Sequence, residues 1–153
     1  MLTIEPIVLY SSKGGNTEKI TRVIMLELGC DSVRIGDSRV PPYLDDFDLV
    51  FVGTGIYWGN PNPDLENFLL SIALRNPKTF ALFLTWGGAG KTNEVVFTKL
   101  TKILEAKGHR VMNNTFSCYG GRKFAFARRG HPNRDDLEAA RQWARSIVNG
   151  VKE

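Results

Sequence analysis

The stretch Tyr10-Ser11-Ser12-Lys13-Gly14-Gly15-Asn16-Thr17 joins an apolar run to a segment with helical periodicity. The apolar run covers residues 4–9, interrupted by Glu5 and Pro6, and predicts a strand over residues 4–10. Apolar side chains recur every three or four positions over residues 16–28. A glycine-rich turn between a strand and a helix suits an anion, because the first N–H groups of the helix lack partners within it and the helix dipole favours negative charge there. We therefore expect a strand, an anion-binding loop and a helix in this order.

The spacing within this loop excludes two common nucleotide-binding motifs. The loop lacks the Gly-Lys-Ser/Thr ending of a Walker loop and the Gly-x-Gly-x-x-Gly spacing of the dinucleotide fingerprint. A plain turn, with Asn16 or Thr17 as the helix N-cap, is the alternative to an anion site.

The rest of the chain alternates strand patterns with helix patterns. Continuous apolar runs at residues 49–52 and 80–84 are typical of strands buried on both faces of a parallel sheet. Further strands are predicted over residues 30–35 and 110–117, and further helices begin near Asp64, Thr92 and Asp135 or Asp136, with Asn76-Pro77 ending the first of these. This alternation predicts an α/β fold in which helices cover both faces of a five-stranded parallel sheet, as one domain over residues 1–153.

Composition narrows the class of protein. Of the 153 residues, 42% are hydrophobic and 24% are charged, which is typical of a globular chain. No apolar run approaches the roughly 20 residues of a membrane span, and no signal-peptide pattern is visible, so we expect a cytoplasmic protein that does not bind membranes. Cys30 and Cys118 have no metal-binding spacing, and we expect reduced, partly buried thiols and no metal site.

The formal net charge of +4 suits an acidic partner protein, a phosphate-bearing ligand or nucleic acid. Nucleic acid is the least favoured of the three, because basic and aromatic residues do not interleave regularly. Part of the charge lies in a segment with no acidic residue, which carries Arg122, Lys123, Arg128 and Arg129. This segment is either a solvated loop or a face that lies beside the ligand or docks a partner.

Three loops that follow predicted strands are rich in glycine, hydroxyl and aromatic residues. In an open parallel sheet, the loops that follow the strands meet at one edge, where ligands bind. The first loop offers donors for a phosphate, and the other two bring Tyr57, Trp58 and Trp86, whose rings are suited to stacking on a flat heterocycle. A phosphate at one end and a flat ring at the other describe a mononucleotide. The alternative for each tryptophan is simple packing in the core.

Nearly the whole chain resembles the flavodoxins, small proteins that bind flavin mononucleotide (FMN). Their phosphate loop reads Ser/Thr-x-Thr-Gly-x-Thr, and Ser12-Lys13-Gly14-Gly15-Asn16-Thr17 matches it, except that Gly14 replaces the middle threonine. Trp58-Gly59 looks like the ring-stacking aromatic of the family and the glycine near flavin N5, and Gly59-Asn60 is the peptide expected to contact N5. The resemblance implies a flavodoxin-like three-layer sandwich with its strands in the order 2-1-3-4-5.

The loops and the resemblance together define a set of candidate FMN-binding residues, with no catalytic residue and no metal ligand. The set is Ser11, Ser12, Lys13, Gly14, Gly15, Asn16, Thr17, Thr54, Gly55, Tyr57, Trp58, Gly59, Asn60, Thr85, Trp86, Gly87 and Gly88. Because no Ser-His-Asp set or carboxylate pair occurs in the loops, we expect a one-electron carrier that serves redox partner proteins, some of them acidic. The alternatives are an FMN-dependent NAD(P)H or quinone reductase and a flavin-free module that binds a partner.

Overall fold

A computed structural model of the chain describes residues 3–36, 44–120 and 130–152. In these residues strands and helices alternate, as the sequence predicts. The strands are β1 (Pro6–Tyr10), β2 (Asp31–Arg34), β3 (Leu49–Gly55), β4 (Thr79–Trp86), β5 (Arg110–Val111) and β6 (Phe116–Tyr119). The helices are α1 (Asn16–Leu28), the short 3-10 helix η1 (Leu44–Asp46), α2 (Pro63–Ser71), α3 (Thr92–Ala106) and α4 (Arg134–Lys152).

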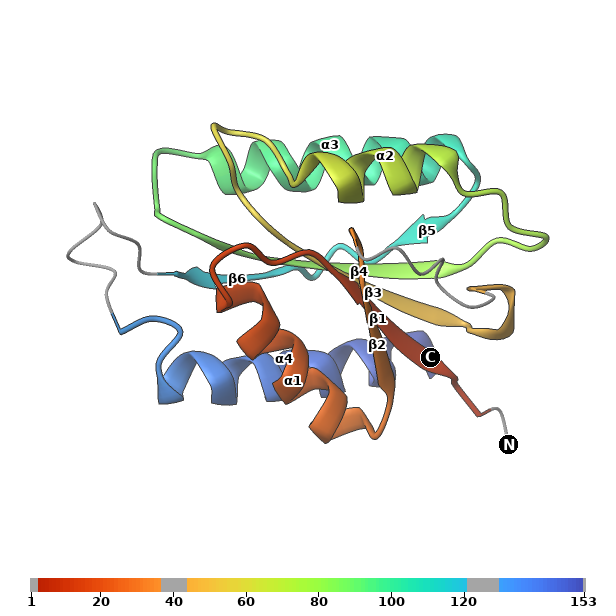
Figure 1. Cartoon of the computed structure of the whole chain (residues 1–153). Helices are drawn as coiled ribbons and strands as arrows, with labels where there is room; N and C mark the ends of the chain where they lie inside the picture. The colour runs from red at the N-terminus through yellow and green to blue at the C-terminus, as the bar shows by residue number, and fades with distance from the viewer. Residues whose placement is uncertain (1–2, 37–43, 121–129, 153) are drawn as a thin grey trace.

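The strands form one parallel sheet in the order β2-β1-β3-β4-β5, which confirms the predicted order. Helices α1 and α4 cover one face of the sheet and α2 and α3 cover the other, so that the molecule has three layers (Figure 1). The loops after β1, β3 and β4 come out at the same end of the sheet, as expected for parallel strands (Figure 1).

The predicted strand over residues 110–117 is divided in two. Both β5 and β6 pair with β4, but the chain takes five steps from Val111 to Phe116 while β4 takes three from Phe80 to Phe83. The extra residues include the pair Asn113-Asn114. Asparagine is depleted in strands, so the pairing is interrupted there and resumes at Phe116.

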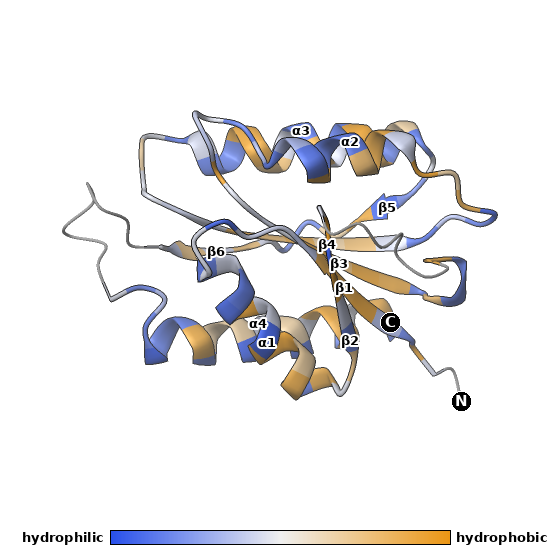
Figure 2. Ribbon diagram, in the orientation of Figure 1, coloured by the Kyte–Doolittle hydropathy of each residue, from blue (hydrophilic) through white to orange (hydrophobic). Residues whose placement is uncertain are grey.

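Alternate residues of the central strands pack into two cores, one under each pair of helices. Ile7 and Leu9 of β1 belong to the core beneath α2 and α3, whereas Val8 belongs to the core beneath α1 and α4. The apolar faces of the helices turn toward these strands (Figure 2). The strands buried on both faces explain the continuous apolar runs of the sequence.

Helix ends differ from the prediction at two places that border the cleft described below. Helix α1 has Gly15 as its N-cap, with φ +84° and no side-chain cap, so neither Asn16 nor Thr17 caps it. Asn62, not Asp64, caps α2. Pro63 occupies the first helical position, and the Asn62 side chain accepts hydrogen bonds from the N–H groups of the second and third helical residues. Helix α2 also ends at Ser71, earlier than predicted.

His109 is a buried histidine just before β5, and its titration is expected to make stability depend on pH. Its Nδ1 accepts from the Lys78 N–H at 3.0 Å. Burial, together with the charges of Lys107 and Lys78, lowers the pKa of His109 below its ordinary value of 6.5. The unfolded chain therefore binds this proton more readily, and the free energy of unfolding should fall as pH decreases through 6.5.

Urea denaturation at about pH 7.5 and about pH 5.5 measures the free energy of unfolding above and below the ordinary pKa of histidine. In His109→Asn an amide oxygen can still accept the bond but does not titrate, so we expect a smaller loss of stability on acidification than in the unsubstituted chain. Equal losses in both proteins would show that another group is responsible.

Candidate functional site

A cleft of about 200 Å³ opens where the loops after β1, β3, β4 and β6 meet. Its lining residues come from all four loops, although they lie far apart in the sequence. They are Ser12, Gly14, Asn16, Thr17, Gly55, Ile56, Tyr57, Thr85, Trp86, Gly87 and Gly120. The structure thus brings the three loops singled out in the sequence to one site and adds a fourth.

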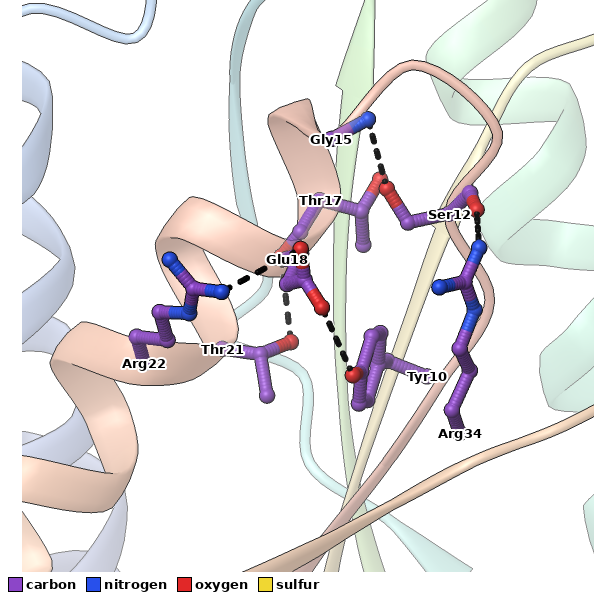
Figure 3. Close-up of polar contacts among 8 residues, drawn as sticks. All are labelled: Tyr10, Ser12, Gly15, Thr17, Glu18, Thr21, Arg22 and Arg34. Atoms are coloured by element: carbon purple, nitrogen blue, oxygen red, sulfur yellow. Dashed lines mark hydrogen bonds and ion pairs between the residues drawn. The ribbon is translucent and has the colours of Figure 1, made fainter.

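One end of the cleft is formed by the start of α1 and two threonines. The Gly15 N–H donates to Ser12 Oγ at 3.0 Å and shapes the turn before the helix (Figure 3). Thr17 Oγ1 and Thr85 Oγ1 lie 2.9 Å apart and join the first loop to the third. Because α1 has no side-chain cap, its first N–H groups and these hydroxyls are suited to an anion.

Ser11 adds an observation that favours a ligand at this end. Its side chain is 1% exposed, and within the described part of the chain its Oγ has no hydrogen-bond partner. A buried hydroxyl without a partner costs about 1–3 kcal/mol, and such groups are rare in native structures. An additional acceptor at the start of α1 would fit the donors already present.

Tyr10 and Glu18 support the loop from beneath. Tyr10 Oη donates to Glu18 Oε1 at 3.1 Å, and Glu18 also pairs with Arg22 across one helical turn at 3.5 Å (Figure 3). Burial, followed by this bond to the carboxylate, raises the pKa of Tyr10. The phenol therefore stays protonated at neutral pH and remains a donor to α1.

Arg34 contacts the loop after β1, and the sequence analysis did not select it as a site residue. It is the last residue of β2, and its Nη2 donates to the main-chain carbonyl of Ser12 in the loop after β1 (Figure 3). The only sequence signal is a basic side chain at the end of a strand, which is common on protein surfaces. The contact depends on β2 lying beside β1, a long-range pairing.

The second loop forms a tight hairpin that turns Trp58 away from the cleft. Tyr57 and Asn60 exchange both main-chain bonds, at 2.7 and 3.1 Å. Trp58 and Gly59 between them have φ of +54° and +79°, which corresponds to a type I′ turn. The Trp58 side chain is 101% exposed and does not line the cleft, and a bulky residue with positive φ is a backbone outlier.

Two aromatic side chains do line the cleft, Tyr57 and Trp86. A Cβ on Gly55 would lie 2.8 Å from Tyr57 Oη, so the glycine lets the phenol fold back over the strand end. Lys13 Nζ lies 4.9 Å from the centroid of the Tyr57 ring, which links the first loop to the second. On the far side, the Trp86 ring lies 6.1 Å from that of Tyr119 at an angle of 31°.

Several predicted residues lie beside the cleft and shape it without lining it. Thr54 is fully buried, and its Oγ1 donates to the Gly55 carbonyl and accepts from the Asn62 N–H. It therefore fixes the second loop to the start of α2. The other predicted residues that do not line the cleft are Ser11, Lys13, Gly15, Trp58, Gly59, Asn60 and Gly88.

Two residues that the sequence analysis did not select, Ile56 and Gly120, do line the cleft. A Cβ on Gly120 would lie 2.7 Å from Asn16 Nδ2, so any larger residue would force the Asn16 side chain to shift where the loop after β6 approaches α1. The glycine pair at 120–121, directly after the predicted fifth strand, is the signal that would have identified it.

The thiols do not contribute to the cleft. Burial raises the pKa of Cys30 to about 11 and that of Cys118 to about 12, so both are protonated and unreactive at neutral pH.

Among the described residues, no group of three or more His, Cys, Asp or Glu side chains is placed to hold a metal ion. Within the same ranges, no helix has the length and apolar character needed to span a membrane. The basic segment Arg122 to Arg129 lies outside the described residues.

Residues 7–124 match the family model described as a flavodoxin domain. The chain belongs to the flavodoxin family. It is 31% identical over 152 residues to the uncharacterized protein MJ0298 of Methanocaldococcus jannaschii, covering 95% of this chain and 99% of that protein.

Solved structures agree on the flavodoxin fold. A flavodoxin from the domain Archaea is 19% identical, with a TM-score of 0.73 over 98% of this chain and all of the other. A Fusobacterium nucleatum flavodoxin bound to flavin mononucleotide is 13% identical, with a TM-score of 0.70 over 97% of this chain and 99% of the other.

Proposed function

We propose that this chain binds FMN in the cleft and carries electrons between redox partner proteins in the cytoplasm. The observation that carries the proposal is the pairing, within one cleft, of an uncapped helix start with two aromatic walls. A phosphate is suited to the first and a flat ring to the second. Support also comes from the Fusobacterium nucleatum flavodoxin, whose structure was solved with this nucleotide.

The residues divide into two groups by their chemistry. At the α1 end, Asn16 and Thr17 present an amide, a hydroxyl and helix N–H groups to the phosphate, while the buried Ser11 hydroxyl is available as a further donor. At the other end, Tyr57 and Trp86 flank the flavin ring and exclude water from its faces. Bound FMN supplies the redox chemistry, and the protein tunes it.

The residues that line the cleft favour a carrier over an enzyme. Among the described residues that line the cleft there is no histidine, carboxylate or cysteine that could move a proton to or from a substrate. A stepwise anaerobic titration with a chemical reductant should therefore resolve two one-electron reductions, and the purified protein should not oxidise NADH or NADPH. Rapid oxidation of either nicotinamide would favour the FMN-dependent reductase instead.

Partner proteins with acidic docking surfaces are part of this proposal. Exposed Lys13, Arg34 and Lys91 lie on the same edge of the sheet as the cleft, in the first loop, at the end of β2 and before α3. An acidic surface would approach this edge favourably at low salt, and the attraction would be screened as ionic strength rises.

Gly59 is expected to affect the two reduction potentials. A peptide after Trp58 that can turn its carbonyl toward flavin N5–H would favour addition of the first electron, and glycine permits this turn. A Cβ on Gly59 would meet nothing within 4 Å, but valine at φ +79° is strained. In Gly59→Val we expect the two one-electron midpoint potentials to lie closer together, as measured by potentiometry.

Gly108→Val is the matched control, because Gly108 has φ +87° and open space around it but lies after α3, away from the cleft. The control should lose stability without a change in either potential. If Gly59→Val left the separation of the two potentials unaltered, Gly59 would have no part in tuning them.

A further inference from the structure

The anion loop is held from outside the cleft by a cation on a neighbouring strand. Arg34, at the end of β2, donates to the Ser12 carbonyl (Figure 3). Strand β2 pairs with β1 on the side away from β3, whereas the cleft lies toward β3, β4 and β6. The guanidinium therefore contacts the loop from the side opposite the cleft.

This contact has a consequence for the next peptide N–H. A trans peptide is planar, so the Ser12 carbonyl and the Lys13 N–H point in opposite directions. When Arg34 holds the carbonyl on the β2 side, the Lys13 N–H is turned toward the side on which the cleft opens. Arg34 thus orients a donor of the loop after β1 from outside the cleft.

The loop needs such support because of its composition. Gly14 and Gly15 directly follow Lys13, and two adjacent glycines allow the backbone many conformations. Gly14 also brings no side-chain hydroxyl to the loop. A fixed loop geometry reduces the ordering cost that anion binding would otherwise carry.

We propose that Arg34 is a positioning residue that makes the site selective for the phosphorylated flavin. The proposal rests on the function proposed above, because it requires that the cleft bind FMN. Through the Ser12 carbonyl, Arg34 orients the Lys13 N–H toward the phosphate, and its charge adds a favourable field at the same end. Removing Arg34 therefore affects the phosphate and leaves the flavin ring in place.

The test compares the affinities of FMN and riboflavin, which share the ring but differ in the phosphate. We expect Arg34→Met to raise the dissociation constant of FMN about 10-fold, as for loss of a hydrogen bond to a charged group, with riboflavin binding within about 2-fold of the parent. Both constants are measured by quenching of flavin fluorescence on titration with the apoprotein.

Arg22→Met is the matched control, because it removes the same charge from the middle of α1, at a side chain that pairs only with Glu18 among the contacts shown in Figure 3. It should change neither constant by more than about 2-fold, since an exposed ion pair contributes little. Equal losses of FMN affinity in Arg22→Met and Arg34→Met would reduce the effect to net charge and overturn the proposal.

Other outcomes separate this inference from the function on which it rests. An unchanged ratio of FMN to riboflavin affinity in Arg34→Met, with the parent binding FMN, overturns the role of Arg34 alone. A parent protein that takes up neither flavin overturns both. If Arg34→Met fails to fold, Arg34→Ala, which also lacks a donor, replaces it, and the same ratio decides.

Discussion

Trp143→Ala is expected to lower the free energy of unfolding by about 3–5 kcal/mol, the largest stability effect that we predict for this chain. The buried Trp143 ring lies 5.5 Å from Phe51, 6.0 Å from Phe83 and 5.7 Å from Phe116, between centroids. Its Nε1 donates to the Asn114 carbonyl at 3.0 Å. Truncation removes this packing between α4 and the sheet and leaves a cavity.

Urea denaturation followed by far-ultraviolet circular dichroism measures this loss. Trp58→Ala is the matched control, because it makes the same truncation at a fully exposed side chain and should change stability by about 0.5 kcal/mol or less. A loss below about 1 kcal/mol in Trp143→Ala would contradict the packing described for α4.

Thr17→Val is expected to weaken FMN binding by about 10–100-fold, the largest effect on the cofactor, because a hydrogen bond to a charged group contributes about 1.5–3 kcal/mol. Valine keeps the shape of Thr17 but removes the hydroxyl that lines the cleft and pairs with Thr85 Oγ1. Riboflavin affinity should stay within about 2-fold of the parent value, because the hydroxyl lies at the phosphate end. Fluorescence titration with each flavin gives both values.

Thr21→Val provides the control for Thr17→Val. Thr21 is equally buried, one turn along α1, and its Oγ1 donates to the Thr17 carbonyl at 3.0 Å, but it does not line the cleft. It should leave FMN affinity nearly unchanged. Comparable losses in the two variants would mean that the effect comes from α1 stability, and the assignment of Thr17 to the phosphate would be wrong.

The features that sequence predicts well here are local ones. The apolar runs of β3 and β4 identify strands buried on both faces, and the turn from Ser12 to Thr17 predicts both the start of α1 and one end of the cleft. In each case a short pattern of side chains determines the conformation directly. The strand order, by contrast, came from the family resemblance.

The features that sequence did not predict depend on contacts between distant residues or on backbone angles. Arg34 reaches Ser12 only because β2 pairs with β1, and Gly120 meets Asn16 only because β6 pairs with β4. The outward position of Trp58 follows from its left-handed backbone, which a tryptophan gives no reason to expect. Such pairings and strained turns become visible only in three dimensions.

Binding of FMN in the cleft is tested by an equilibrium titration of the purified apoprotein with this nucleotide. We expect saturable uptake of one FMN per chain, with quenching of flavin fluorescence and tighter binding than for riboflavin. A protein that shows no uptake of FMN, or that binds riboflavin equally well, would contradict the phosphate role of the loop from Ser12 to Thr17.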